Sequence, residues 1–232
     1  MTYRIFIGDQ MFSSWSLRGW LMLEKFSLSY DVKRIGLYSG TMQQEMAALS
    51  PARLVPALIL PDGTIVGESL AIAETLAERH PEAGHWPADS GARATARWLC
   101  AEMVSGFGAL RHDCPMQLFF RYQGFAPSAD VQRDLRRIEA LWSHARAVSG
   151  ASKGPLFGEY SLADVFFAPV AARVVGYDLP LSPSNRAYCE FLVQEPAFVK
   201  WRAQGETDTY DPFPYPMGLP TEPWPEAPVN QT

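Results

Sequence analysis

The hydrophobic pattern of this chain changes near residue 80, and that change constrains the fold more than any other feature of the sequence. Up to about His80, strand-like and helix-like segments alternate, which is typical of an α/β domain. After Pro87, apolar residues recur at the three-and-four spacing of amphipathic helices, one helix after another. We therefore expect an α/β domain over residues 1–80 and an all-α domain over residues 90–204, joined by a linker at 81–89.

The first domain has the pattern of one βαβ unit followed by a hairpin and a closing helix. Pro61-Asp62-Gly63 separates two short apolar runs at the spacing of a β-hairpin. Strands are expected at 3–7, 30–35, 57–60 and 64–66, and helices at 14–26, 41–49 and 69–79.

The second domain is predicted to be entirely helical, with helices at 93–110, 128–148, 162–175, 184–193 and 196–203. The segment 162–175 is almost wholly apolar, so it is expected to be buried on all sides at the centre of this domain. The tail, residues 205–232, is rich in proline and aromatic residues, which disfavours regular structure. Its aromatic rings predict packing over the helical domain, at the edge of a binding cleft.

Composition excludes several classes of protein. The 232 residues carry 20 Lys and Arg against 25 Asp and Glu, a formal net charge of −5, so nucleic acid and anionic membranes are not expected partners. No segment approaches the ~20 apolar residues of a membrane span, and the N-terminus lacks the apolar core of a signal peptide. The three cysteines and four histidines show no metal-ligand spacing. A cytoplasmic protein without a metal site is expected.

Residues 54–70 combine features suited to a peptide-like ligand. Val55-Pro56 precedes an expected strand, where a cis bond would turn the Val55 amide and carbonyl toward a ligand backbone. Glu68 and Ser69 open a helix, with Ser69 expected as its N-cap. The free N–H groups and positive dipole end of that helix favour a carboxylate, and Glu68 beside it suits an ammonium group.

A serine cluster, Ser13-Ser14-Trp15-Ser16, lies between the first strand and the first helix. Hydroxyls at a helix N-terminus can donate to a thiolate, and the helix dipole favours the anion, so the pKa of a bound thiol falls below its usual ~8.5. No GxSxG turn surrounds the cluster, so a serine nucleophile is not expected. A thiol oxidoreductase is set aside because it would need a cysteine here.

The order of these motifs resembles the glutathione-binding domain of the glutathione S-transferases. The resemblance rests on three segments in order: Ser13-Ser14-Trp15-Ser16-Leu17-Arg18, Ser50-Pro51-Ala52-Arg53-Leu54-Val55-Pro56 and Glu68-Ser69. Independently, Ser161-Leu162-Ala163-Asp164 resembles the N-capping box of that family's helical domain. The resemblance implies a thioredoxin-like N-terminal domain, an all-helical C-terminal domain and a homodimer.

The serine pattern is most similar to the serine-type zeta class, which includes the maleylacetoacetate isomerases. This resemblance implies that glutathione is the co-substrate. Ser13 or Ser14 would activate its sulfur, Val55 would hold its cysteinyl backbone, and Glu68 with Ser69 would hold its γ-glutamyl end.

Two positions depart from the zeta pattern. Trp15 stands where the zeta motif has a cysteine, and Leu54 stands where a polar residue often helps to hold the tripeptide. Arg53 can supply part of that polar contact. Within the serine pair, Ser13 is preferred because it lies five residues before Arg18, which is the spacing of the family serine.

The electrophile site is expected from the first helix of the helical domain and the segment after it. The candidates for a partly apolar pocket are Met103, Phe107, Arg111 and Met116. Met103 and Phe107 also suit the buried face of that helix, and Arg111 suits a carboxylate-bearing substrate. Transfer of glutathione to a small electrophile is the favoured function. The alternatives are cis–trans isomerisation of the maleylacetoacetate type and a non-catalytic binding module.

Overall fold

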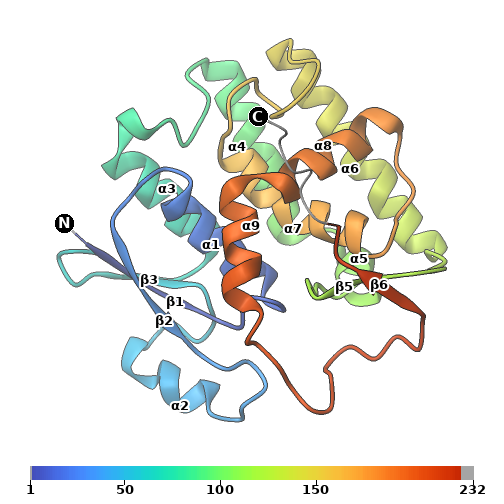
Figure 1. Cartoon of the computed structure of the whole chain (residues 1–232). Helices are drawn as coiled ribbons and strands as arrows, with labels where there is room; N and C mark the ends of the chain where they lie inside the picture. The colour runs from blue at the N-terminus through green and yellow to red at the C-terminus, as the bar shows by residue number, and fades with distance from the viewer. Residues whose placement is uncertain (1, 226–232) are drawn as a thin grey trace, which may run out of the picture.

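The computed structural model describes residues 2–225 and places an α/β unit against a bundle of helices (Figure 1). The α/β unit contains β1 (Tyr3–Ile7), α1 (Ser14–Glu24), β2 (Tyr30–Arg34), α2 (Met42–Met46), β3 (Ala57–Ile59), β4 (Ile65–Val66) and α3 (Ser69–Arg79), with a 3-10 turn at Ala47–Leu49. A second 3-10 turn, Pro81–Ala83, lies in the linker. The helical unit contains α4 (Ser90–Ser105), α5 (Gly108–Asp113), β5 (Phe120–Tyr122), α6 (Ala129–Ser149), α7 (Leu162–Gly176), α8 (Pro183–Gln194) and α9 (Pro196–Gly205), and the tail adds β6 (Thr221–Pro223).

The four-stranded sheet has the thioredoxin-like arrangement that the sequence resemblance implies. Its strand order is β2-β1-β3-β4, with β1 parallel to β2 and both remaining pairs antiparallel. Residues of β1 alternate between two cores: Ile5 and Ile7 join the main core with α1 and α3, whereas Phe6 packs on a smaller core beneath α2. This alternation follows from the two-residue period of a strand.

The α7 helix is the centre of the helical unit, as its apolar sequence predicts. Every residue from Leu162 to Gly176 is buried. The helix contacts α8, α4 and α1, so it joins the helical unit to the first helix of the α/β unit. The prediction of a central, fully buried helix is confirmed.

The single helix expected at 93–110 is wrong, because the chain forms two helices there. Gly106 leaves the helical conformation with φ −108° and ψ −169°, and Phe107 follows at φ +62°. A Cβ on Gly106 would lie 2.9 Å from the carbonyl oxygen of Glu102. The break between α4 and α5 therefore depends on glycine.

The C-terminal tail packs on the protein as far as residue 225. It leaves the foot of α9, passes below the helical unit in Figure 1 and returns as β6, which pairs with β5. Trp224 at its end is only 5% exposed. The expected packing of the tail is confirmed over these residues, but the β5–β6 pair is regular structure that the sequence did not predict.

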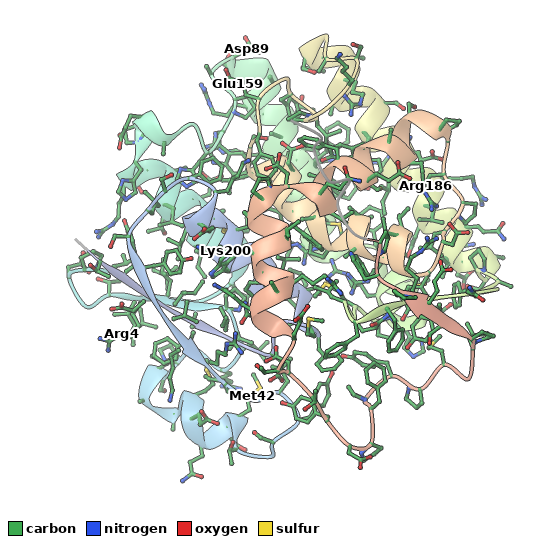
Figure 2. The ribbon with its side chains drawn as sticks, in the orientation of Figure 1. Arg4, Met42, Asp89, Glu159, Arg186 and Lys200 are labelled. Carbon is green, nitrogen blue, oxygen red and sulfur yellow. The ribbon has the colours of Figure 1, made fainter. Side chains whose placement is uncertain are left out.

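Polar contacts join the two units along α1 and α9. Lys200 extends from α9 toward α1 (Figure 2), where its Nζ lies 2.6 Å from Glu24 Oε1. Lys25 pairs with Glu195, and the buried Arg18 donates its Nε–H to the carbonyl oxygen of Phe166 at 2.9 Å. These contacts hold α1, the helix that begins at the serine cluster, against the helical unit.

Candidate functional site

Two cavities adjoin at the junction of the α/β unit and the helical unit. The first cavity, of about 610 Å³, is lined by Trp15, Pro51, Ala52, Arg53, Leu54, Val55, Pro56, Ile65, Gly67, Glu68, Ser69 and Val104. The second cavity, of about 470 Å³, is lined by Phe12, Ser13, Ser14, Trp15, Leu37, Met42, Leu54, Val55, Arg111, Pro115, Met116, Arg173 and Tyr215. Three residues, Trp15, Leu54 and Val55, belong to both walls. A ligand held in the first cavity can therefore reach the second.

The first cavity brings together all the residues expected to bind glutathione. Arg53, Leu54, Val55 and Pro56 form one side, and Glu68 and Ser69 form another. The Val55–Pro56 bond is cis. The Val55 side chain is 8% exposed, whereas the apolar side chain of Leu54 is 65% exposed at the rim. Contact with a ligand would remove the Leu54 side chain from water.

The expected N-cap at Ser69 is wrong, because Glu68 holds that position. Glu68 has φ +61°, and Ser69 is the first residue of α3, with a buried side chain. A left-handed conformation costs a residue other than glycine roughly 1–2 kcal/mol. At Glu68 the chain turns from β4 into α3. The first N–H groups of α3 have no side-chain cap, and they lie beside the first cavity.

A close helix contact brings the serine cluster beside Val55. A Cβ on Gly19 of α1 would lie 2.6 Å from Pro56 Cβ, so only glycine permits this approach. Because Ser14 begins the same helix, the approach places the N-terminus of α1 at the shared wall of the two cavities.

The two candidate serines have different surroundings. Ser13 is the N-cap of α1: its Oγ accepts the N–H of Ser16 at 3.2 Å and donates to Ser16 Oγ at 2.8 Å. Ser16 Oγ in turn accepts the N–H of Gly8 at 2.8 Å. The Ser14 hydroxyl has no hydrogen-bond partner among residues 2–225, although the residue is only 8% exposed. Ser14 therefore has a donor available to a ligand in the second cavity.

Two arginines, Arg111 and Arg173, line the second cavity, and a third, Arg18, packs against the Trp15 ring of its wall. Arg18 is fully buried, and its guanidinium carbon lies 4.5 Å from the centre of the Trp15 ring. The guanidinium carbon of Arg111 lies 4.6 Å from the same ring. Arg173 donates to the carbonyl oxygens of Cys114 at 2.8 Å and Pro169 at 3.0 Å. In the described part of the chain, none of the three arginines forms an ion pair.

Burial lowers the pKa of each of these arginines, and their mutual repulsion adds to the effect for Arg18 and Arg173. The pKa of Arg173 falls to about 10, first through burial and then through the charge of Arg111. The pKa of Arg18 falls through burial and through both neighbouring guanidinium groups. That of Arg111 falls through burial, partly offset by the charge of Asp134. Arg111 and Arg173 both line the second cavity, so its positive charge favours an anion.

The structure separates the four residues expected to form the electrophile pocket. Arg111 and Met116 line the second cavity. Met103 and Phe107 belong to the main core, with 2% and 6% exposure, and line neither cavity. Arg111 also accommodates the break after α4, since it donates to the carbonyl oxygens of Met103 and Gly106. Its Nη1 forms no hydrogen bond with the described residues.

Sequence reasoning missed Arg173 and Tyr215 as lining residues. Arg173 had a signal, because it is a charged residue within an otherwise apolar helix that was expected to be fully buried. Tyr215 had only the aromatic character of the tail. Its position in the wall depends on the path of the tail, which no local pattern specifies.

The tail is attached to the loop that carries the serines. Asp208 accepts the backbone N–H groups of Gln10 and, at 3.2 Å, Met11, and it pairs with Arg34 at 3.1 Å. Tyr210 donates its hydroxyl to Asp9 at 2.7 Å. These contacts fix the loop between β1 and α1 just before the serine cluster.

Two further properties bear on the class of protein. Within residues 2–225, no helix is both long enough and apolar enough to cross a lipid bilayer. The same residues contain no group of three or more His, Cys, Asp or Glu side chains that could hold a metal ion.

Residues 12–79 match the N-terminal domain of the glutathione S-transferases. The chain is 30% identical over 200 residues to a probable maleylacetoacetate isomerase of Caenorhabditis elegans, an alignment that covers 84% of this chain and 91% of the relative. It is also 30% identical over 175 residues to the maleylacetoacetate isomerase of Rattus norvegicus, covering 73% and 77% of the two chains.

A solved structure has the same overall fold. A glutathione transferase homologue from Burkholderia BGR1, crystallised with bound glutathione, superposes with a TM-score of 0.64 at 26% identity, covering 88% of this chain and 98% of the other. The fold, the domain match and the length of the sequence alignments agree. The chain belongs to the glutathione S-transferase family, within which it is zeta-like.

Proposed function

We propose that this protein is an enzyme that binds glutathione in the first cavity, activates its sulfur where the two cavities meet, and receives a small electrophile in the second. The observation that carries the proposal is the wall common to both cavities, formed by Trp15, Leu54 and Val55. A tripeptide thiol fits such a site because its backbone and charged ends can occupy one cavity while its sulfur faces the other.

The polar groups of the first cavity match the ends of glutathione. The γ-glutamyl carboxylate would accept from the free N–H groups at the start of α3, near Ser69, and its ammonium would lie beside Glu68. Val55 lies just before the first register position of β3, Ala57, so its backbone groups can pair with the cysteinyl residue. Arg53 would add a cationic contact at the rim.

We assign the thiolate donor role to Ser14 and a capping role to Ser13. The Ser14 hydroxyl has no hydrogen-bond partner among residues 2–225 and lies at the first position of α1, where the helix dipole also favours an anion. The Ser13 proton is already donated to Ser16. A hydrogen bond to a charged group contributes on the order of 1.5–3 kcal/mol, which would lower the pKa of the bound thiol by roughly 1–2.

The chemical step is nucleophilic addition by sulfur. The thiol proton leaves to solvent, and a sulfur electron pair forms a C–S bond to the electrophilic carbon. The electron pair displaced from that carbon either departs with a leaving group or takes up a proton at the adjacent carbon. Arg111 and Arg173 would stabilise the developing negative charge on the electrophile.

Isomerisation is the second candidate function, and the unpaired arginines favour it. Nη1 of Arg111 and Nη2 of Arg173 form no hydrogen bond with the described residues, so both can hold a carboxylate of the substrate. Sulfur would add to a carbon–carbon double bond, rotation would follow about the resulting single bond, and loss of the thiol would restore the double bond. Two relatives reported above are named as isomerases of this kind.

The proposed function is tested by an ultraviolet difference titration of reduced glutathione against the protein from pH 5 to 9. We expect a saturable thiolate signal well below the usual thiol pKa of ~8.5. In Ser14→Ala the pKa of the bound thiol should rise by roughly 1–2, because the donor is lost. In Ser13→Ala it should stay low while the free energy of unfolding falls by about 0.5–2 kcal/mol, because a cap is lost.

Other outcomes would change the proposal. Loss of the thiolate signal in Ser13→Ala alone, with the fold intact, would transfer the donor role to Ser13. Glutathione binding without a lowered thiol pKa and without turnover would support a non-catalytic binding module. The homodimer stays a prediction from the family resemblance, and light scattering would test it. The cytoplasmic location stays a prediction from the composition and the N-terminal sequence.

A further inference from the structure

A third cavity, of about 480 Å³, lies directly beyond the second. The two cavities share Pro115 and Tyr215 as lining residues. On its far side the third cavity is partly apolar, with Phe125 and Met217 in its wall. Tyr215 therefore has the second cavity on one side and the third on the other.

The main chain at Tyr215 is held in place independently of its ring. Its carbonyl oxygen accepts the Tyr122 hydroxyl at 2.8 Å. Upstream the tail is attached through Asp208, and downstream it pairs with β5 through residues 221–223. Removal of the ring would leave these backbone and tail contacts intact.

The ring of Tyr215 is also fixed from the side of the active-site loop. Its centre lies 5.7 Å from that of Phe12 at an interplanar angle of 76°, and 6.1 Å from that of Tyr38 at 86°. The hydroxyl groups of Tyr38 and Tyr215 are hydrogen-bonded. An aromatic ring held on several sides acts as a rigid wall.

We propose that Tyr215 is a specificity-determining residue that sets the maximum length of the electrophile. This inference rests on the proposed function, because it requires the second cavity to receive the group attached to the glutathione sulfur. The ring stops that group at the boundary with the third cavity. The protein as it stands selects short electrophiles, and loss of the ring would join the two cavities into one longer site.

The experiment measures the affinity of a series of S-alkylglutathiones by calorimetry, with methyl, propyl, hexyl, nonyl and dodecyl substituents. Each buried methylene should increase affinity about fourfold until the chain meets the wall. In the wild-type protein, affinity should stop increasing at or before the hexyl compound. In Tyr215→Ala it should keep increasing up to the longer chains, giving a dodecyl-to-hexyl affinity ratio at least ~tenfold above that of the wild type.

Matched variants separate a wall from a structural role. Tyr215→Phe keeps the ring and should therefore retain the wild-type limit on the length of the alkyl chain. Met217 lines only the third cavity, so Met217→Trp added to Tyr215→Ala should fill the new space and shorten the limit again. If Tyr215→Ala folds poorly, Tyr215→Leu replaces it, because leucine keeps an apolar side chain in the tail. Its length limit should lie between those of the wild type and Tyr215→Ala.

The outcomes distinguish this inference from the proposed function. If S-methylglutathione binds every variant and affinity depends on alkyl length in the same way in all of them, the role of Tyr215 is overturned. The proposed glutathione site is then unaffected. A wild-type affinity that keeps rising to the dodecyl compound also overturns the role of Tyr215. Failure of S-methylglutathione to bind the wild type overturns the proposed function and this inference together.

Discussion

At the scale of single residues, the most unusual feature is positive charge without a paired acid. Trp15 lies within 4.6 Å of both Arg18 and Arg111, measured from each guanidinium carbon to the ring centre. The electron-rich face of an aromatic ring attracts cations, at about 0.5–2 kcal/mol for each contact. The ring therefore replaces part of the stabilisation that a carboxylate would give, and it leaves the charge of Arg111, which lines the second cavity, available to a ligand.

A first prediction concerns Arg173 and the charge of the ligand. S-carboxymethylglutathione should bind more tightly than its neutral counterpart S-ethylglutathione, because its added carboxylate faces Arg111 and Arg173. In Arg173→Gln that preference should fall by about 1.5–3 kcal/mol, the range for a hydrogen bond to a charged group. Calorimetry with both ligands measures the preference directly.

The control for this prediction is Arg133→Gln, since Arg133 lies on the exposed face of α6 and pairs with Asp130. That variant should retain the wild-type preference for the carboxylate. An equal loss of affinity for both ligands in Arg173→Gln would contradict the assignment, because it would show that Arg173 maintains the shape of the cavity rather than recognising charge.

At the residue scale, the sequence grouped residues that lie together in the structure where their order along the chain carried the information, and their binding of glutathione stays a prediction. The six residues expected to bind glutathione lie within 54–69 or directly beside it, and all line one cavity. The different hydrogen bonding of Ser13 and Ser14 was not predictable, because it depends on which hydroxyl finds a partner in the folded chain. The Ser13 hydroxyl donates to that of Ser16, three residues later, whereas the Ser14 hydroxyl forms no hydrogen bond with the described residues.

At the scale of elements, α7 depends on one buried acid at its N-terminus. Asp164 accepts hydrogen bonds from the N–H groups of Ser161 at 2.9 Å and Leu156 at 3.0 Å. It also accepts from the hydroxyls of Ser161 at 3.2 Å and Tyr188 at 2.8 Å. One carboxylate thus joins the start of α7 to the preceding loop and to α8.

Two substitutions at this cap should differ in their effect on stability. Asp164→Ala leaves four buried donors without their acceptor, at about 1–3 kcal/mol each, so the free energy of unfolding should fall by at least ~4 kcal/mol. Ser161→Ala removes a single capping side chain and should cost about 0.5–2 kcal/mol. Denaturant unfolding measures both values. Equal losses would contradict the central place of Asp164.

Element boundaries were predictable where periodicity extends over many residues. The expected helix at 69–79 matches α3, and the expected burial of α7 is complete. The β5–β6 pair has strands of three residues that are about a hundred positions apart in sequence, so neither strand has a detectable period. The break at Gly106 was signalled by glycine, but the choice between a weak helix and a turn depends on tertiary contacts.

At the scale of the whole molecule, the site exists only where distant segments meet. The second cavity takes its walls from the loop before α1, the segments on either side of α2, the region around α5, the last turn of α7 and the tail. Such a cavity has no sequence signature, because its volume depends on how the two units pack. The substrate range therefore depends on contacts between the units and on the path of the tail.

His85 of the linker is one of the residues that join the two units. Its ring nitrogen Nε2 lies 3.2 Å from the carbonyl oxygen of Met22 in α1, and the ring stacks on Phe26 at 4.1 Å. Its own carbonyl oxygen accepts the N–H of Leu162, the first residue of α7, at 2.8 Å. The other ring nitrogen, Nδ1, is buried and has no partner among the described residues.

This arrangement predicts a loss of stability on acidification. Burial lowers the pKa of His85 below its usual ~6.5, because the charged ring loses its contact with water and the hydrogen bond to the Met22 carbonyl offsets only part of that loss. Below pH ~6.5 the unfolded chain binds a proton that the folded protein resists. The contribution of His85 to the free energy of unfolding is therefore full above that pH and is lost as the pH falls, by up to ~1.4 kcal/mol per pH unit.

The measurement is denaturant unfolding at pH 7.5, 6.5 and 5.5 for the wild type, His85→Phe and His112→Gln. The phenylalanine variant should be less stable at pH 7.5, because it loses the bond to Met22, but its stability should fall less steeply toward pH 5.5. His112 is 90% exposed at its side chain, so its substitution should leave the wild-type slope unchanged. A slope in His85→Phe as steep as that of the wild type would show that the junction between the two units does not depend on the protonation of His85.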